Sequence, residues 1–146
     1  MKVHLSISRV LPHAPETVWQ KIRDFNGLPS WHPMIARSHI EGGKSGDQVG
    51  AVRNFDTHEG GNIREQLLCL NDRDWVIVYS ILESGMGVSH YVAEISLQRI
   101  SHDNATLAKW TADFDCAEDQ AAELEQFIGQ TVFQGGLAHL DKGLSA

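Results

Sequence analysis

The sequence predicts an α+β fold in which a curved, seven-stranded antiparallel sheet wraps around a long C-terminal helix. Two short helices are expected between the first and second strands. Two observations support this fold. Seven segments have the composition and alternation of strands, and short runs of turn residues separate most of them. The C-terminal segment instead repeats its apolar residues with helical spacing. A long amphipathic helix can cover one face of such a sheet, and this helix-grip arrangement often encloses a cavity.

The composition is that of one domain, which we place over residues 1–146. With 146 residues, 42% of them apolar, the chain can bury a core without disulfides or structural metals. A net charge of −7 argues against nucleic-acid and anionic-membrane partners, since both recruit Lys and Arg. No apolar run approaches the roughly 20 residues that span a bilayer, and the N-terminus lacks a signal peptide's apolar core. We expect a cytoplasmic monomer or homodimer in which Cys69 and Cys116 are reduced.

The first elements follow from a change in apolar spacing. Residues 2–10 alternate between apolar and polar side chains and predict a strand. Residues 14–25 switch to helical spacing, with Pro15 suited to the first turn. Asn26-Gly27 ends this helix. Residues 28–33 then form a compact bend, which is the second short helix.

Six further strands are expected before the long helix. We place them at 34–41, 49–58, 62–71, 75–83, 88–101 and 104–115. The short breaks between them favour antiparallel hairpins. Residues 117–144 return to helical spacing, and their apolar stripe changes face near Gly135-Gly136. Glycine costs roughly 1 kcal/mol in a helix interior, so this pair indicates a bend, close packing or a locally weak helix.

A series of short motifs, in this order, resembles the START-like superfamily. The motifs are Ala14-Pro15-Glu16-x-Val18-Trp19, Asp24-Phe25, Trp31-His32-Pro33, Val49-Gly50-Ala51-Val52-Arg53, Arg64-Glu65-x-Leu67, Tyr91 and Trp110-x-Ala112-x-Phe114-Asp115. The superfamily includes bacterial polyketide cyclase/dehydrase-like proteins, the birch-pollen-allergen fold and plant abscisic-acid receptors. The resemblance covers nearly the whole chain and implies the helix-grip fold. It does not specify a function, because this fold hosts carriers, receptors, cyclases and lyases.

Alternation along each strand predicts which side chains face the cavity. The expected ligand-binding residues on the strands are Arg53, Phe55, Glu65, Leu67, Tyr79, Ile81, Tyr91, Ala93, Trp110 and Ala112. Cys69 is expected on the same face as Leu67. The long helix is expected to contribute Ile128 and Val132. A slip of one residue in the register of a strand would invert its inward face.

Arg53 and Glu65 are the charged residues in this inward set. They lie on neighbouring strands in phase with apolar residues, and a buried charge requires a partner. One interpretation is that the two neutralise each other and orient the cavity wall. The other is that one of them meets a polar group of the ligand. In the abscisic-acid receptors that the chain resembles, the position matching Glu65 lines the pocket. Their ligand-carboxylate lysine corresponds to Ala36, which leaves Arg53 as the main inward cation for an anionic ligand.

Four residues are candidates for acid–base chemistry: Glu65, Tyr79, Tyr91 and His90. A tyrosine can polarise a carbonyl, but it can equally be an amphipathic core residue with its hydroxyl satisfied. His90 could reach the cavity mouth as a general base or remain on the surface. His32, within Trp-His-Pro, is expected to brace the short helix. The histidines form no HxH or HExxH pattern, so no metal site is expected. No other cofactor is expected either.

Two glycine-containing loops are candidate gates to the cavity. One contains Gly60 and Gly61, and the other contains Met86 between two glycines. In the resembling receptors these positions form a gate and a latch; ordinary hairpin flexibility is the alternative. The sequence therefore predicts a carrier or sensor that binds a small hydrophobic molecule, with aromatic and anionic molecules among the candidates. One alternative is a cofactor-independent cyclase or dehydratase of the polyketide type. Another is an interaction protein whose cavity is vestigial.

Overall fold

Seven strands form one antiparallel sheet in the order β1-β7-β6-β5-β4-β3-β2. The structure is a computed structural model that describes all residues from Met1 to Ala146. The strands are β1 (Lys2–Leu11), β2 (Ile35–Ile40), β3 (Val52–Thr57), β4 (Asn62–Asn71), β5 (Val76–Glu83), β6 (Ser89–Ile100) and β7 (Ala105–Asp115). All seven predicted strands are present. The largest difference is at β3, which begins at Val52 because Gly50 just before it turns the chain with φ of 94°.

The helices also follow the predicted order. Helix α1 (Pro15–Ile22) and the 3-10 turn η1 (Leu28–Ser30) lie between β1 and β2, and a second 3-10 turn, η2 (Glu41–Gly43), follows β2. The C-terminal helix has four consecutive parts: η3 (Glu118–Gln120), α2 (Ala121–Gln126), the π-helical η4 (Phe127–Gln134) and α3 (Gly135–Ser145). None of the helices combines the length and the apolar character needed to cross a membrane.

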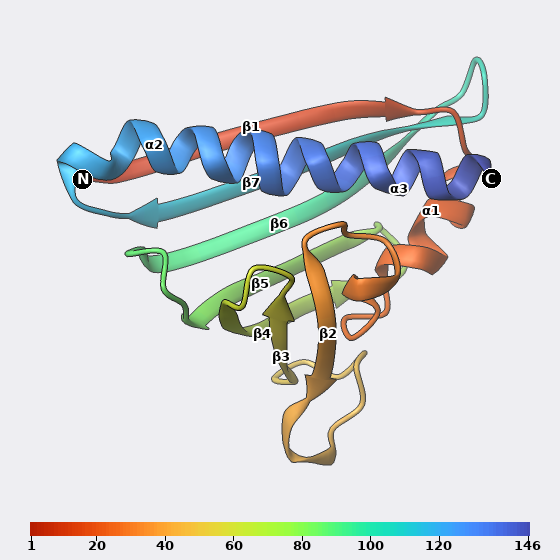
Figure 1. Cartoon of the computed structure of the whole chain (residues 1–146). Helices are drawn as coiled ribbons and strands as arrows, with labels where there is room; N and C mark the ends of the chain where they lie inside the picture. The colour runs from red at the N-terminus through yellow and green to blue at the C-terminus, as the bar shows by residue number, and fades with distance from the viewer.

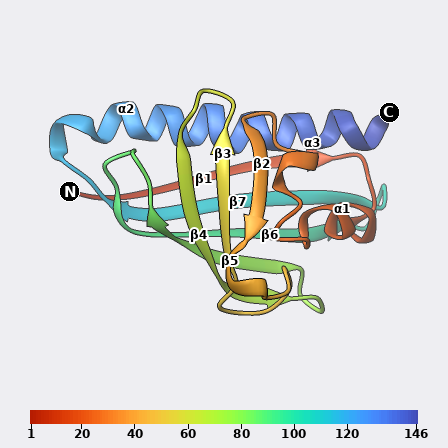
Figure 2. The ribbon, with the colours of Figure 1, turned by 60° about the horizontal axis from the view of Figure 1, so that its bottom comes forward.

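The sheet curves strongly around the C-terminal helix. In Figure 1 the helix runs alongside β1 and β7, while β2 to β5 turn away below it. Figure 2 shows β2, β3 and β4 running crosswise to β1, β7 and the helix. The apolar core lies between the helix and the concave face of the sheet. At its centre the ring of Trp110 on β7 stacks on Phe133 of η4, with 4.4 Å between ring centroids.

Close packing explains the glycine pair in the long helix. A Cβ atom on Gly136 would lie only 2.7 Å from Cδ2 of His32 and 3.1 Å from the ring of Trp110. The same atom on Gly135 would be in ordinary contact, 3.5 Å from the Gln130 carbonyl oxygen. Gly136 therefore lets the helix approach the sheet and the bend after η1. Of the predicted alternatives, the structure shows close packing.

A bulge in β4 corrects one sequence-based assignment. Leu67 pairs with Tyr79, but the register shifts before Cys69, so that Leu70 pairs with the buried Ile77. Leu70 rather than Cys69 packs against the core. The prediction that Cys69 shares the inward face of Leu67 is wrong, because the bulge inserts a residue and reverses the alternation that follows it.

Candidate functional site

A cavity of about 390 Å³ lies between the concave face of the sheet and the C-terminal helix. Most of its lining residues are hydrophobic, and its volume falls within the roughly 300–1,000 Å³ of small-molecule sites. Nine of the twelve residues predicted to bind ligand line it: Arg53, Phe55, Glu65, Tyr79, Ile81, Tyr91, Trp110, Ile128 and Val132. The other three, Leu67, Ala93 and Ala112, are buried without lining the cavity.

One wall of the cavity was missed by sequence reasoning. It is formed by the bend after α1 and the start of β2, through Leu28, His32, Met34 and Ile35. Ile35 could have been found, because it is an apolar residue at the start of a predicted strand. No local periodicity marks the other three as inward, since the bend belongs to no regular element. Their position depends on how the bend folds back against the helix.

The cavity holds a buried ion pair between β3 and β4. The register places Arg53 directly opposite Glu65. Glu65 Oε1 accepts hydrogen bonds from Arg53 Nε at 2.8 Å and lies 2.6 Å from Nη2, while Nη1 donates to the Phe25 carbonyl at 3.1 Å. The guanidinium carbon also lies 4.0 Å from the ring centroid of Phe25 and 4.8 Å from that of Tyr79. Burial raises the pKa of Glu65, and the Arg53 charge opposes this rise.

Two buried tyrosines stand beside the ion pair. Trp110 Nε1 donates to the hydroxyl oxygen of Tyr79 at 3.0 Å. Tyr91 stacks on Phe114 with 5.7 Å between ring centroids. Burial, and then the negative charge of Glu65, raise the pKa of Tyr79 well above its usual range, and burial also raises the pKa of Tyr91. Both phenols therefore remain protonated near neutral pH and offer hydrogen bonds rather than a base.

His32 joins the bend after η1 to the C-terminal helix. Its Nδ1 accepts a hydrogen bond from the Met34 backbone N–H at 3.2 Å, so the ring proton is on Nε2, which donates to the Val132 carbonyl at 2.7 Å. Burial lowers the pKa of His32 to about 4, which keeps the imidazole neutral near pH 7. His32 is expected to brace the short helix; in addition, it connects two distant segments and lines the cavity.

His90 is not at the cavity. Its side chain is 84% exposed, and Nδ1 lies 3.0 Å from Asp115 Oδ2 on the outer side of the sheet. The neighbouring Tyr91 is buried and faces inward. His90 has a φ of 52° within an irregular stretch of β6, and this turns its side chain to solvent, so the idea that it serves as a base at the cavity mouth is corrected.

Parts of both candidate gate loops line the cavity. Gly61 comes from the loop between β3 and β4, and Met86 from the loop between β5 and β6. Gly60 does not line the cavity; its φ of 94° shapes the turn before β4. Met86 and Phe127 also line a surface hollow of about 300 Å³ beside α2. These two side chains therefore lie between the cavity and this hollow, and opening of the loops stays a prediction.

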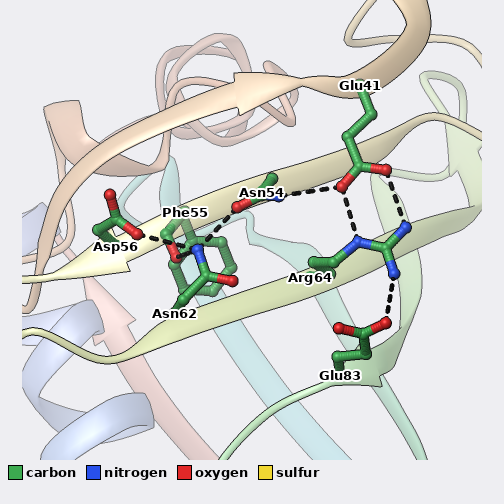
Figure 3. A network of polar contacts seen from close by, with 7 residues as sticks. All are labelled: Glu41, Asn54, Phe55, Asp56, Asn62, Arg64 and Glu83. Atoms are coloured by element: carbon green, nitrogen blue, oxygen red, sulfur yellow. Dashed lines mark hydrogen bonds and ion pairs between the residues drawn. The ribbon is translucent and has the colours of Figure 1, made fainter.

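A polar network on the outer face of the same strands supports the ion pair (Figure 3). Arg64 donates to Glu41 at 2.7 and 2.8 Å and to Glu83 at 2.8 Å, which links η2, β4 and β5. Asn62 Nδ2 donates to Asn54 at 2.7 Å across the β3–β4 pair. Hydrogen bonds from Arg64 and Asn54 lower the pKa of Glu41 to about 2. The network stabilises the register that places Arg53 opposite Glu65.

The site contains no candidate metal centre. No group of three or more His, Cys, Asp or Glu side chains is arranged to hold a metal ion. The polar groups at the cavity are instead the ion pair, the phenols and the neutral imidazole described above.

Comparisons with known proteins agree with this architecture. The sequence profile described as polyketide cyclase/dehydrase and lipid transport matches residues 2–144. The protein XoxI from Bacillus cereus is 29% identical, with a TM-score of 0.86 over 98% of this chain and 96% of its own. A protein from Thermobifida fusca is 27% identical, with a TM-score of 0.88 over 97% and 93%. Norcoclaurine synthase from Thalictrum flavum is 12% identical with a TM-score of 0.77 over 99% and 95%, a likeness of fold alone. No curated protein matches the sequence.

Proposed function

The chain belongs to the polyketide cyclase/dehydrase and lipid transport family, and on this premise we propose that it binds a small, largely apolar molecule in the cavity as a carrier or sensor. The observation that carries the proposal is the cavity of about 390 Å³, whose wall is mostly hydrophobic with a single buried ion pair. An apolar cavity with a few converging polar groups is the usual form of a small-molecule site. The apolar wall supplies binding energy, and the polar groups orient the molecule.

Filling the cavity with a large side chain tests this proposal. Ile81 on β5 lines the cavity, whereas the next residue, Leu82, is exposed. The substitutions Ile81→Trp and Leu82→Trp add the same indole on opposite faces of one strand. We expect the uncharged fluorescent probe N-phenyl-1-naphthylamine to bind one molecule per chain in the wild type and in Leu82→Trp. Ile81→Trp should weaken binding at least tenfold.

Equal probe binding by the two variants would refute the cavity as the site. A far-ultraviolet circular dichroism spectrum and a thermal melt identify variants that fail to fold. Native mass spectrometry of the protein purified from its own source then gives the mass of the natural ligand. A carrier or sensor returns that molecule unchanged after incubation.

An acid–base enzyme of the cyclase or dehydratase type is the second candidate. It is favoured by Glu65, a carboxyl at the cavity whose pKa is raised by burial and which can exchange a proton with a bound substrate. Under this alternative the mass of the bound molecule changes on incubation. The substitution Glu65→Gln would then abolish the change of mass while the molecule still binds.

A further inference from the structure

The ion pair leaves specific hydrogen-bonding groups of Arg53 and Glu65 without a partner in the protein. The Arg53 guanidinium has five N–H groups. Nε and Nη2 interact with Glu65 Oε1, and Nη1 donates to the Phe25 carbonyl. With one hydrogen on each Nη engaged, one hydrogen on Nη1 and one on Nη2 remain without an acceptor in the protein. Arg53 lines the cavity, and these two hydrogens are the donors of its side chain that no protein group uses.

Glu65 supplies an unused acceptor beside these donors. Both contacts from Arg53 reach Oε1, and Oε2 accepts no hydrogen bond from the protein. The polar side-chain atoms that are fully enclosed without a partner belong to other residues: Asn26, Trp31 and Ser38. Oε2 therefore retains contact with open space, and the open space that Glu65 lines is the cavity.

The guanidinium is held in place by two aromatic rings as well as by its hydrogen bonds. Its carbon lies 4.0 Å from the ring centroid of Phe25 and 4.8 Å from that of Tyr79. Such cation–π contacts, together with the hydrogen bonds to Glu65 and Phe25, fix the plane of the Arg53 side chain. The open donors consequently point in set directions, and a ligand must match them.

The interior of the cavity carries no net charge. Arg53 and Glu65 are the oppositely charged buried residues of its wall, and they cancel. His32 is neutral near pH 7 because burial lowers its pKa to about 4. Glu59, the remaining carboxylate that lines the cavity, is exposed to solvent. A carboxylate or ammonium group on the ligand would enter as a third buried charge with no counter-charge of its own, which is costly.

We infer that the ligand is uncharged and that its polar end combines a hydrogen-bond acceptor for Arg53 with a donor for Glu65, as in a primary carboxamide or a lactam. This inference rests on the proposed binding function and names the class of its ligand. It replaces the anionic ligand that Arg53 alone suggests in the sequence. The apolar body of the molecule lies against the hydrophobic wall, and its amide spans the two charged side chains.

Matched amide and acid probes test the inference by isothermal titration calorimetry at pH 7.5. The pairs are 2-naphthamide with 2-naphthoate, 4-phenylbenzamide with 4-phenylbenzoate, and decanamide with decanoate. We expect at least one amide to bind tenfold or more tightly than its acid, a difference of about 1.4 kcal/mol. Binding of the acids as tightly as the amides would overturn the inference while leaving the cavity function intact. Absence of binding by every probe, including N-phenyl-1-naphthylamine, would instead contradict the binding function itself.

Two charge-removing variants locate the source of the preference. Glu65→Gln keeps the shape of the side chain but leaves Arg53 without its counter-charge, so the preference should shift toward the acids by at least tenfold. Glu83→Gln removes the same charge from the outer-face network, where Glu83 pairs with Arg64; Glu83 does not line the cavity. This control should retain the wild-type preference. An unchanged preference for amides over acids in folded Glu65→Gln would contradict the role of Glu65 as the counter-charge of Arg53. If this variant does not fold, the comparison of amides with acids on the wild-type protein still decides the ligand class.

Discussion

Replacing Gly136 with alanine should destabilise the protein although alanine is the better helix former. Alanine in a helix interior favours folding by roughly 0.5–1 kcal/mol relative to glycine. At this position, however, the new Cβ would lie 2.7 Å from Cδ2 and 2.8 Å from Nε2 of His32. The two side chains that this Cβ would meet, His32 and Trp110, cannot easily move. His32 is fixed by hydrogen bonds to Met34 and Val132, and Trp110 stacks on Phe133.

The magnitude follows from the competing contributions. Overpacking a filled core costs about 1–3 kcal/mol, and displacing His32 from the Val132 carbonyl costs on the order of 1 kcal/mol more. After the gain in helix propensity, we expect Gly136→Ala to lower the free energy of unfolding by about 1–3 kcal/mol. For a domain of this size, that corresponds to a fall in Tm of roughly 3–9 °C.

Urea unfolding followed by tryptophan fluorescence, with a parallel thermal melt, measures this loss. Gly143→Ala is the matched control, because nothing lies within 4 Å of a Cβ at that position of the same helix. It should be as stable as the wild type or up to about 1 kcal/mol more stable. The reasoning is refuted if Gly136→Ala is at least as stable as Gly143→Ala, since the contact with His32 would then impose no cost.

Two further predictions concern buried ionisable groups. The pKa of His32 is about 4 in the folded protein and about 6.5 in the unfolded chain. Between these two pH values the unfolded state therefore binds one proton more than the folded state. The free energy of unfolding should fall by up to about 3 kcal/mol as the pH drops from 6.5 to 4. Urea unfolding at several pH values should show this slope reduced in His32→Gln, and an equal slope would contradict it. Arg53→Met leaves Glu65 buried without a counter-charge and should cost about 3–5 kcal/mol, whereas Arg64→Met, which leaves Glu41 and Glu83 on the outer face in contact with water, should cost clearly less. Similar losses in equilibrium unfolding of the two methionine variants would show that burial does not control the effect.

Local periodicity was sufficient for most of the sheet and for the polar centre of the cavity. Arg53 and Glu65 were placed inward because each is in phase with apolar neighbours, and the β3–β4 register sets them opposite each other. Alternation failed where the backbone departed from a regular strand. At Cys69 a bulge reversed the faces, and a bulge leaves no reliable signal in residue type.

The C-terminal helix shows a second limit of local patterns. Its apolar stripe predicts a helix over 117–144, and the structure contains one from Glu118 to Ser145. The π-helical turns from Phe127 to Gln134 were not predicted. A π turn holds more residues than an α turn, so it shifts the apolar stripe to another face, but in the sequence the glycine pair at the same point accounts for that shift equally well. The glycine pair was visible in the sequence, but the partner that requires Gly136 to be small is His32, about 100 residues away.

By itself, the sequence determined the strand and helix order, the inward position of Arg53 and Glu65, and the family, because alternation and short motifs are properties of neighbouring residues. Only the tertiary structure decided how the cavity is closed. The curvature of the sheet brings His32 to the Val132 carbonyl across 100 residues of chain, and it places Arg53 against the rings of Phe25 and Tyr79. These contacts depend on how helices and strands pack against one another, and the spacing of apolar residues along the chain does not specify that packing. They also leave the polar centre of the cavity neutral, which Arg53 considered alone does not indicate.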